Sequence, residues 1–118
     1  MAIVTFKDLD VWQKSMQLVK EIYRLTNTFP DEEKYGLVGQ MRRCCISIPS
    51  NIAEGHRRGS RKDYARFVSM AYGSSAELET QIDAACLLNY CADAEVIGSR
   101  QLLDDVSRML NKLRQSLM

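Results

Sequence analysis

The sequence has little of what several classes of protein require. Its 118 residues include two prolines, one histidine and four cysteines, and no two cysteines have Cys-x-x-Cys spacing. This set does not fit a zinc site, so we expect no metal and no cofactor. The cysteines are expected to be small buried residues in a reducing compartment. No stretch approaches the roughly 20 apolar residues that span a bilayer.

Catalytic signatures are missing as well. The sequence contains no P-loop, no nucleophile elbow and no dinucleotide-binding fingerprint. A di-metal site in a helical bundle needs Glu-x-x-His pairs, and His56 forms none. We therefore expect that the protein is not an enzyme. Residues 1–10 lack the charged and long apolar regions of a secretory signal, so we expect a cytoplasmic protein without a membrane partner.

Strand-like alternation is also absent, and the apolar residues recur at spacings of three and four, the period of a helix. This period predicts helices over about 8–27, 31–56, 60–90 and 93–117. Short turns between helices of this length favour an all-α fold, an antiparallel up-down-up-down four-helix bundle. We expect residues 1–118 to form a single domain.

Proline and glycine positions predict irregularities within these helices. Pro49 cannot donate a hydrogen bond to the carbonyl of Cys45, so we expect a kink or a local break there. Gly55 and Gly59 bracket the end of the second segment and can supply left-handed caps. The run 73–75, Gly-Ser-Ser, removes bulk from the third segment, and we expect another backbone to approach closely there.

The first and fourth segments carry more apolar residues than one bundle core can absorb. The first has two neighbouring stripes, one of Leu9, Trp12, Met16, Val19 and Tyr23 and one of Val11, Leu18, Ile22 and Leu25. In the fourth segment a heptad-like seam is flanked by Ile97, Leu102 and Met109. The excess predicts a homo-oligomer. The alternative is a monomer with a few surface apolar residues.

Charge is segregated along the chain although the formal net charge is only +1. Residues 42–66 hold seven basic and two acidic residues, whereas the rest of the chain holds nine basic and thirteen acidic ones. A basic patch on a mildly acidic body is typical of proteins that bind polyanions, most often nucleic acid. The candidate nucleic-acid-binding residues are Arg42, Arg43, Arg57, Arg58, Arg61, Lys62 and Arg66.

The expected start of the third helix strengthens this interpretation. Arg61 and Lys62 fall in its predicted first turn, where positive side chains are mildly unfavourable and an anion is favourable. We expect this local loss of helix stability to be offset when a phosphate binds there. The competing interpretation is a solvated turn whose charges only keep the protein soluble.

Four blocks of the sequence resemble a known family. They are FKDLDVWQKSMQL at 6–18, FPDEEKYGLVGQMRR at 29–43, SIPSNIAEGHRRGSRKDYARF at 47–67 and AYGSSAELETQI at 71–82. The chain is identified by them as a member of the "four-helix bundle protein" family, also called 23S rRNA intervening-sequence proteins. The resemblance extends from Phe6 to about Leu117.

The resemblance implies a four-helix bundle, and because several members of the family assemble as a five-fold ring, we expect a ring-shaped homopentamer. The family has no established enzyme activity to carry over. RNA binding is the role usually considered for such proteins. A relative, the accessory protein of diversity-generating retroelements, is a basic pentamer that binds nucleic acid and a reverse transcriptase. The expected function is therefore binding of RNA or DNA through the basic surface between the second and third helices. The alternative is a scaffold for a protein partner, such as a reverse transcriptase or a ribosome-associated protein, without direct nucleic-acid contact.

The family signature also contains residues for which we expect a structural role. Their polar members are expected to be buried and to fix the register of the bundle. The competing interpretation, catalysis by these carboxylates, lacks an acid–base partner. The signature residues are Pro49, Asn51, Glu54, Gly55, Gly73, Ser74 and Glu77.

Overall fold

Four long helices form most of the computed structural model, which describes residues 2–118. They are α1 (Asp10–Thr26), α2 (Leu37–Arg58), α3 (Arg61–Leu87) and α4 (Ile97–Ser116). Three 3-10 turns precede α1, α2 and α4: η1 (Phe6–Asp8), η2 (Asp31–Glu33) and η3 (Asp93–Val96). The described residues contain no strand, so the predicted all-α fold with four helices is confirmed. None of these helices is apolar over a length that would cross a bilayer.

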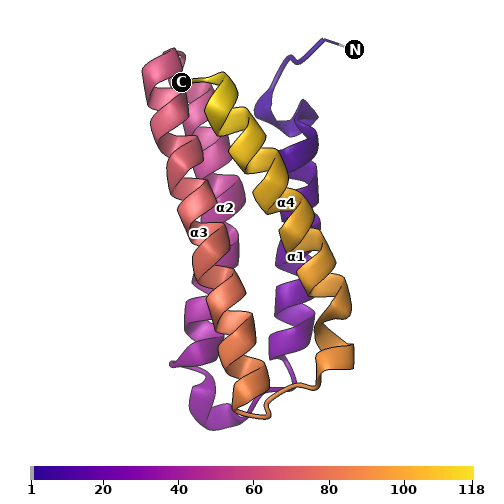
Figure 1. Cartoon of the computed structure of the whole chain (residues 1–118). Coiled ribbons are helices and arrows are strands. Elements are labelled where there is room, and N and C mark those ends of the chain that lie inside the picture. The colour runs from indigo at the N-terminus through magenta and orange to yellow at the C-terminus, as the bar shows by residue number, and fades with distance from the viewer. Residues whose placement is uncertain (1) are drawn as a thin grey trace.

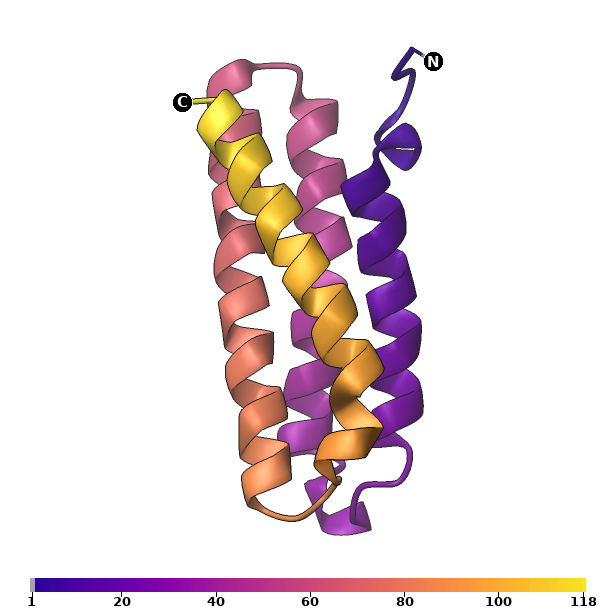
Figure 2. The same cartoon turned by 45° about the vertical axis from the view of Figure 1, so that its right-hand side comes forward.

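Successive helices run in alternating directions along a body of 43 × 25 × 21 Å (Figure 1). Each of α1 and α3 packs against both α2 and α4, so the four helices surround one core. The α2–α3 connection lies at the same end as both chain ends, as Figure 2 shows. We call this the junction end. The α1–α2 and α3–α4 connections lie at the opposite end, which we call the far end.

The core is built from one apolar stripe of each helix. In α1 this is the second of the two predicted stripes, Val11, Leu18, Ile22 and Leu25. The stripe of α2 is Val38, Met41, Cys45, Ile48 and Ile52, all of which are buried. From α3 and α4 the core receives Phe67, Ala71, Leu78, Ile82, Ala85, Leu103, Val106 and Leu110. Helical spacing therefore identified the apolar stripes of α1, and the packing of the helices decides which of the two stripes faces the core.

Helix ends depart from the predicted boundaries where local hydrogen bonds intervene. Asn89 has a left-handed φ of 62°, and the Tyr90 N–H donates to the Ala85 carbonyl at 3.0 Å. The Asn89 N–H donates to the Cys86 carbonyl, also at 3.0 Å. This pair of bonds is a Schellman motif, which ends α3 at Leu87 and not at about 90.

The second and fourth helices begin later than predicted because 3-10 turns replace their first turns. The Leu37 N–H, in the first turn of α2, donates to the Glu33 carboxylate at 3.3 Å. The Tyr90 hydroxyl donates to the other oxygen of the same carboxylate at 2.8 Å. Glu33 therefore links the start of α2 to the α3–α4 connection at the far end.

Pro49 does not break α2, which is continuous from Leu37 to Arg58, so of the predicted kink or local break the break is absent. The Pro49 ring is itself buried, and the helix packs against both α1 and α3. Tertiary packing of this kind supplies most of the stability of a helix and can offset one missing hydrogen bond. The Asn51 side-chain amide donates to the Ser47 carbonyl at 2.8 Å.

The glycines differ from their predicted roles. Gly59 is the left-handed cap of α2, with φ of 87°, as predicted. Gly55 is not a cap, because it lies inside α2, where an added Cβ would be 2.6 Å from the Phe67 Cβ. At Gly73, within residues 2–118, an added Cβ would meet no atom within 4 Å outside its own stretch of helix, so no other backbone in the described part of the chain approaches it. The close approach of α2 and α3 is therefore at Gly55.

Candidate nucleic-acid interface

Five of the seven predicted basic residues gather at the junction end. Arg57 and Arg58 end α2, and Gly59 then reverses the chain. The Ser60 hydroxyl accepts a hydrogen bond from the Asp63 N–H at 3.0 Å, so α3 begins at Arg61. We call Arg57, Arg58, Arg61, Lys62 and Arg66 the junction cluster; all five are exposed.

Two carboxylates neutralise part of this cluster. Glu54 pairs with Arg58 at 2.8 Å, and Asp63 lies 3.6 Å from Arg66. Exposed pairs of this kind contribute about 0–1 kcal/mol each and are easily exchanged for another anion. The other three members of the cluster, Arg57, Arg61 and Lys62, have no carboxylate partner within residues 2–118. The junction end therefore keeps an excess of positive charge.

Aromatic rings hold three of the guanidinium groups in place. The Arg57 guanidinium lies 5.4 Å from the centre of the Phe6 ring. Arg58 and Arg66 lie 4.9 and 4.7 Å from the Phe67 ring, which is only 6% exposed. Cation–π contacts restrict these long side chains and leave their charge in water. Phe67 is thus a core residue that supports the cluster and is not available to stack on a base.

Sequence reasoning missed two contributors to this end of the molecule. Phe6 belongs to η1, which packs against α2 far along the chain. The Arg61 guanidinium donates a hydrogen bond to the Ser116 carbonyl in the last turn of α4. Both contacts depend on which helix ends meet in the bundle, and no local spacing pattern contains that information.

The structure does not bring Arg42 and Arg43 to the junction cluster. Arg42 precedes Arg57 on the same helix by 15 residues, which at 1.5 Å per residue is about 22 Å. Its guanidinium donates to the Thr26 hydroxyl at 2.9 Å and to the Asn27 side-chain carbonyl at 3.1 Å. It therefore fixes the end of α1. Arg43 is exposed on α2 at the same distance from the cluster.

The polar signature residues are less buried than predicted. Glu54 and Glu77 are both exposed, so the prediction that they are buried is wrong. Ser74 does join the helices, because its hydroxyl accepts a hydrogen bond from the Ser47 hydroxyl of α2 at 2.8 Å. The Cys44 thiol donates to the Ser74 carbonyl at 3.1 Å. Burial, and then the negative charge of Glu77, raise the pKa of the Cys44 thiol to about 12.

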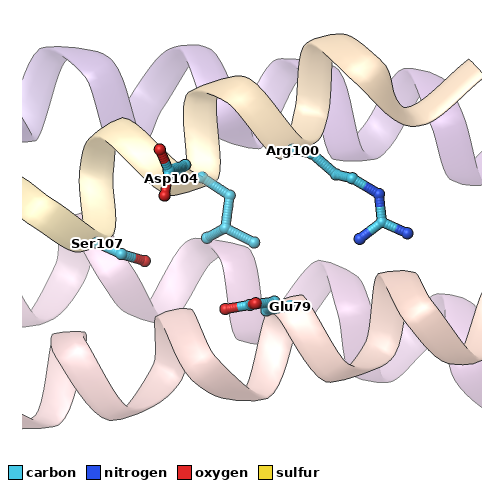
Figure 3. Close-up of a pocket in the computed structure, with 5 residues that line it drawn as sticks. Glu79, Arg100, Asp104 and Ser107 are labelled. Atoms are coloured by element: carbon cyan, nitrogen blue, oxygen red, sulfur yellow. The ribbon is translucent and has the colours of Figure 1, made fainter.

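A hollow of about 210 Å³ lies between α3 and α4, away from the junction cluster. Figure 3 shows Glu79 facing Asp104 and Ser107 across it, with Arg100 extending away from them. The Arg100 guanidinium instead pairs with Asp83 at 2.6 Å. The lining offers two carboxylates and one hydroxyl. His56 does not line this hollow; it lies in the last turn of α2, where its ring packs edge-on against that of Tyr64.

Comparison with known protein families gives a match over nearly the whole chain. The family model described as 23S rRNA-intervening sequence protein matches residues 7–112, from η1 into the last turns of α4. The matched range contains the whole junction cluster. No curated protein matches the sequence.

Proposed function

The chain belongs to the 23S rRNA-intervening sequence protein family, and we propose that it is a cytoplasmic, non-enzymatic homo-oligomer that binds RNA or DNA. The junction cluster is the binding surface in this proposal. The phosphates of a nucleic acid would exchange with water and with the weakly paired carboxylates of Glu54 and Asp63. Binding of this kind depends strongly on salt and carries little sequence specificity.

A single observation carries the proposal. Arg57, Arg61 and Lys62 are exposed, close together in the chain and without a carboxylate partner within the described residues. The start of α3 adds to their effect, because free backbone N–H groups and the helix dipole favour an anion there. A phosphate would also offset the unfavourable position of two basic side chains in the first turn of the helix.

The test is a double substitution, Arg61→Glu with Lys62→Glu, measured by fluorescence anisotropy with a structured RNA at two salt concentrations. Acidic residues suit the first turn of a helix, so this variant should fold at least as well as the original chain. We expect its affinity to fall by tenfold or more at low salt. The slope of log K against log salt should also decrease by about 2, since each lost phosphate contact removes roughly 0.9.

The matched control is Lys20→Glu with Lys34→Glu, which makes the same change in net charge at exposed positions outside the cluster. The control should keep most of its affinity. If the two variants lose affinity equally, binding follows the net charge and the cluster has no special role. If the Arg61→Glu, Lys62→Glu protein binds RNA as tightly as the original chain, the junction cluster is not the binding surface.

The second proposed feature is assembly, and the observation that favours it is an apolar groove between α1 and α2. The groove has a volume of about 310 Å³ and is lined by Phe6, Trp12, Met16, Val19, Ile46, Pro49, Ser50 and Ala53. It contains members of the first predicted stripe of α1. In the proposed ring-shaped homopentamer this groove receives a second copy of the chain. If a different protein occupies it and no nucleic acid binds, the chain is a scaffold.

A further inference from the structure

Two thiols meet at the far end of the bundle, outside the proposed interface. Cys86 lies in the last turn of α3 and Cys91 just beyond it, and their Sγ atoms are 3.7 Å apart. The reversal at Asn89 brings them together by folding the chain back onto the helix end. Cys86 is half-buried and Cys91 is 7% exposed.

We propose that Cys86 and Cys91 form a redox-active dithiol, which a small-molecule disulfide such as glutathione disulfide converts into an intramolecular disulfide. The sulfurs of a disulfide are about 2.05 Å apart, so the two Sγ atoms must approach by less than about 2 Å. Side-chain rotation can supply part of this movement. The remainder requires adjustment of the short segment between Leu87 and Tyr90, most of which is not helical.

The surroundings assign different roles to the two thiols. The Arg100 guanidinium of α4 lies 3.8 Å from the Cys86 Sγ and is held there by its ion pair with Asp83. A positive charge beside a sulfur favours the thiolate, which is the attacking species. Burial, and then the hydrogen bond with Cys86, raise the pKa of the Cys91 thiol to about 12. Cys86 is therefore the first nucleophile and Cys91 the resolving thiol.

The reaction takes place in two exchange steps. The Cys86 thiolate attacks one sulfur of glutathione disulfide, the S–S bond of that molecule breaks, and one glutathione thiolate leaves and takes up a proton. Cys91 then gives up its proton and attacks the Cys86 sulfur of the mixed disulfide. The second glutathione leaves as a thiol. Two protein thiols are oxidised and one glutathione disulfide is reduced to two glutathione molecules.

The other two cysteines provide an internal comparison. Cys44 and Cys45 are adjacent on α2, and both are buried. The Cys44 thiol donates to the Ser74 carbonyl, and the Cys45 thiol donates to the Arg42 carbonyl at 3.2 Å. Each is thus bonded to a backbone carbonyl, and we expect neither to react.

Tryptic digestion separates the two pairs, because no Lys or Arg lies between Arg66 and Arg100. Peptide 67–100 contains Cys86 and Cys91, and peptide 44–57 contains the other two cysteines. The folded protein is incubated with glutathione disulfide, quenched in acid, unfolded, alkylated and digested. We expect peptide 67–100 to be two hydrogens lighter and not alkylated. Peptide 44–57 should be alkylated at both cysteines.

Three variants test the assigned roles. Cys91→Ser should stop at the first step and retain glutathione on Cys86. Arg100→Gln should slow oxidation by roughly threefold, because it removes the positive charge that favours the attacking Cys86 thiolate. The effect is small, because a less stabilised thiolate is also a stronger nucleophile. Asp83→Asn removes the ion pair that holds the guanidinium in place but keeps the positive charge, and it should slow oxidation less than Arg100→Gln does.

The proposal is overturned if peptide 67–100 stays fully alkylated in the folded wild-type protein at a ratio of glutathione disulfide to glutathione that oxidises the unfolded chain. It is also overturned if peptide 44–57 is oxidised as readily as peptide 67–100. The geometry around Cys86 would then not make disulfide formation any faster than it is at the two buried cysteines of α2. Neither outcome bears on nucleic-acid binding, which uses the opposite end of the molecule.

Discussion

At the scale of single residues, the surroundings of a side chain decide what a sequence motif means. Gly55 and Gly73 both belong to the family signature, and both lie inside helices. An added Cβ would be 2.6 Å from the Phe67 Cβ at Gly55 and would touch nothing within 4 Å at Gly73. The same substitution should therefore have opposite effects at the two positions.

We expect Gly55→Ala to lower the free energy of unfolding by about 1–3 kcal/mol, because α2 and α3 must move apart to admit the methyl group. Gly73→Ala should raise it by up to about 1 kcal/mol, because alanine is the better helix former and the site is open. Chemical denaturation of both variants measures the difference. Equal effects would show that the close contact at Gly55 does not constrain the packing.

The basic residues show which members of the candidate site the sequence alone could predict. Grouping Arg57 with Arg61 needed only the expectation that one helix ends and another starts between them. Arg42 was grouped with them because charge was counted along the chain, whereas its guanidinium bonds to the end of α1. Phe6 was missed because its contact with Arg57 joins segments about 50 residues apart.

At the scale of helices, the described ion pairs mostly lie within one helix, and two join different helices. Asp105 of α4 pairs with Lys14 of α1 at 3.2 Å, and Arg100 pairs with Asp83 across α3 and α4. The hydrogen bond from Lys14 lowers the pKa of the Asp105 carboxyl below its usual value of 3.8. The ionised carboxylate therefore stabilises the folded state above that value, and this contribution is lost as the pH falls through the lower, folded-state pKa.

Asp105→Asn tests this linkage through the dependence of the melting temperature on pH. We expect the variant to melt below the wild type at about pH 6, and the gap to narrow below pH 3.8 and to close as the pH falls through the lower, folded-state pKa of Asp105, where the wild-type carboxyl also becomes neutral. The control is Asp104→Asn, because Asp104 pairs only with Arg108 of the same helix. A gap that stays constant with pH would mean that Asp105 acts through packing.

Helix existence and helix ends differ in how well the sequence predicts them. The stripes that become the core were readable because apolar spacing is a local property with the period of the helix. The helix ends depended on single local features, such as the hydrogen bond from the Tyr90 hydroxyl to the Glu33 carboxylate or the left-handed conformation of Asn89. The sequence predicted a helix on both sides of Pro49 but not whether the helix stays continuous there, since packing by α1 and α3 offsets the local defect.

At the scale of the whole molecule, the fold places two kinds of surface next to each other, because Phe6 lines the apolar groove and also contacts Arg57 of the junction cluster. The junction cluster occupies the end that carries both chain ends (Figure 2), and the apolar groove occupies the side between α1 and α2. In the proposed ring, lateral contacts through the groove would place every copy of the cluster at one height. Five copies acting together would bind a long polyanion far more tightly than one. Assembly and nucleic-acid binding should therefore be coupled.

The predicted excess of apolar residues on α1 is found in this groove, but that on α4 largely is not. Met16 and Ile46 are 43% and 42% exposed in the groove. On α4, Leu102 and Met109 pack against the core, and only Ile97 is strongly exposed. The groove is thus the better candidate for the contact between copies, and α4 has less apolar surface to contribute than the sequence indicated.

We expect Ile46→Glu to convert the proposed pentamer into monomers, because a carboxylate buried in an apolar contact without a partner is strongly unfavourable. Light scattering coupled to size-exclusion chromatography measures the particle mass, which should fall from about five chains to one. Met70→Glu is the control, since Met70 is 49% exposed on α3, outside the groove.

The monomeric variant keeps its junction cluster, so its RNA affinity should fall through lost multivalency, by about 100-fold or more. An Ile46→Glu protein of unchanged mass would exclude the groove as the contact. A monomer with undiminished RNA affinity would show that one cluster is sufficient and that the ring serves another purpose.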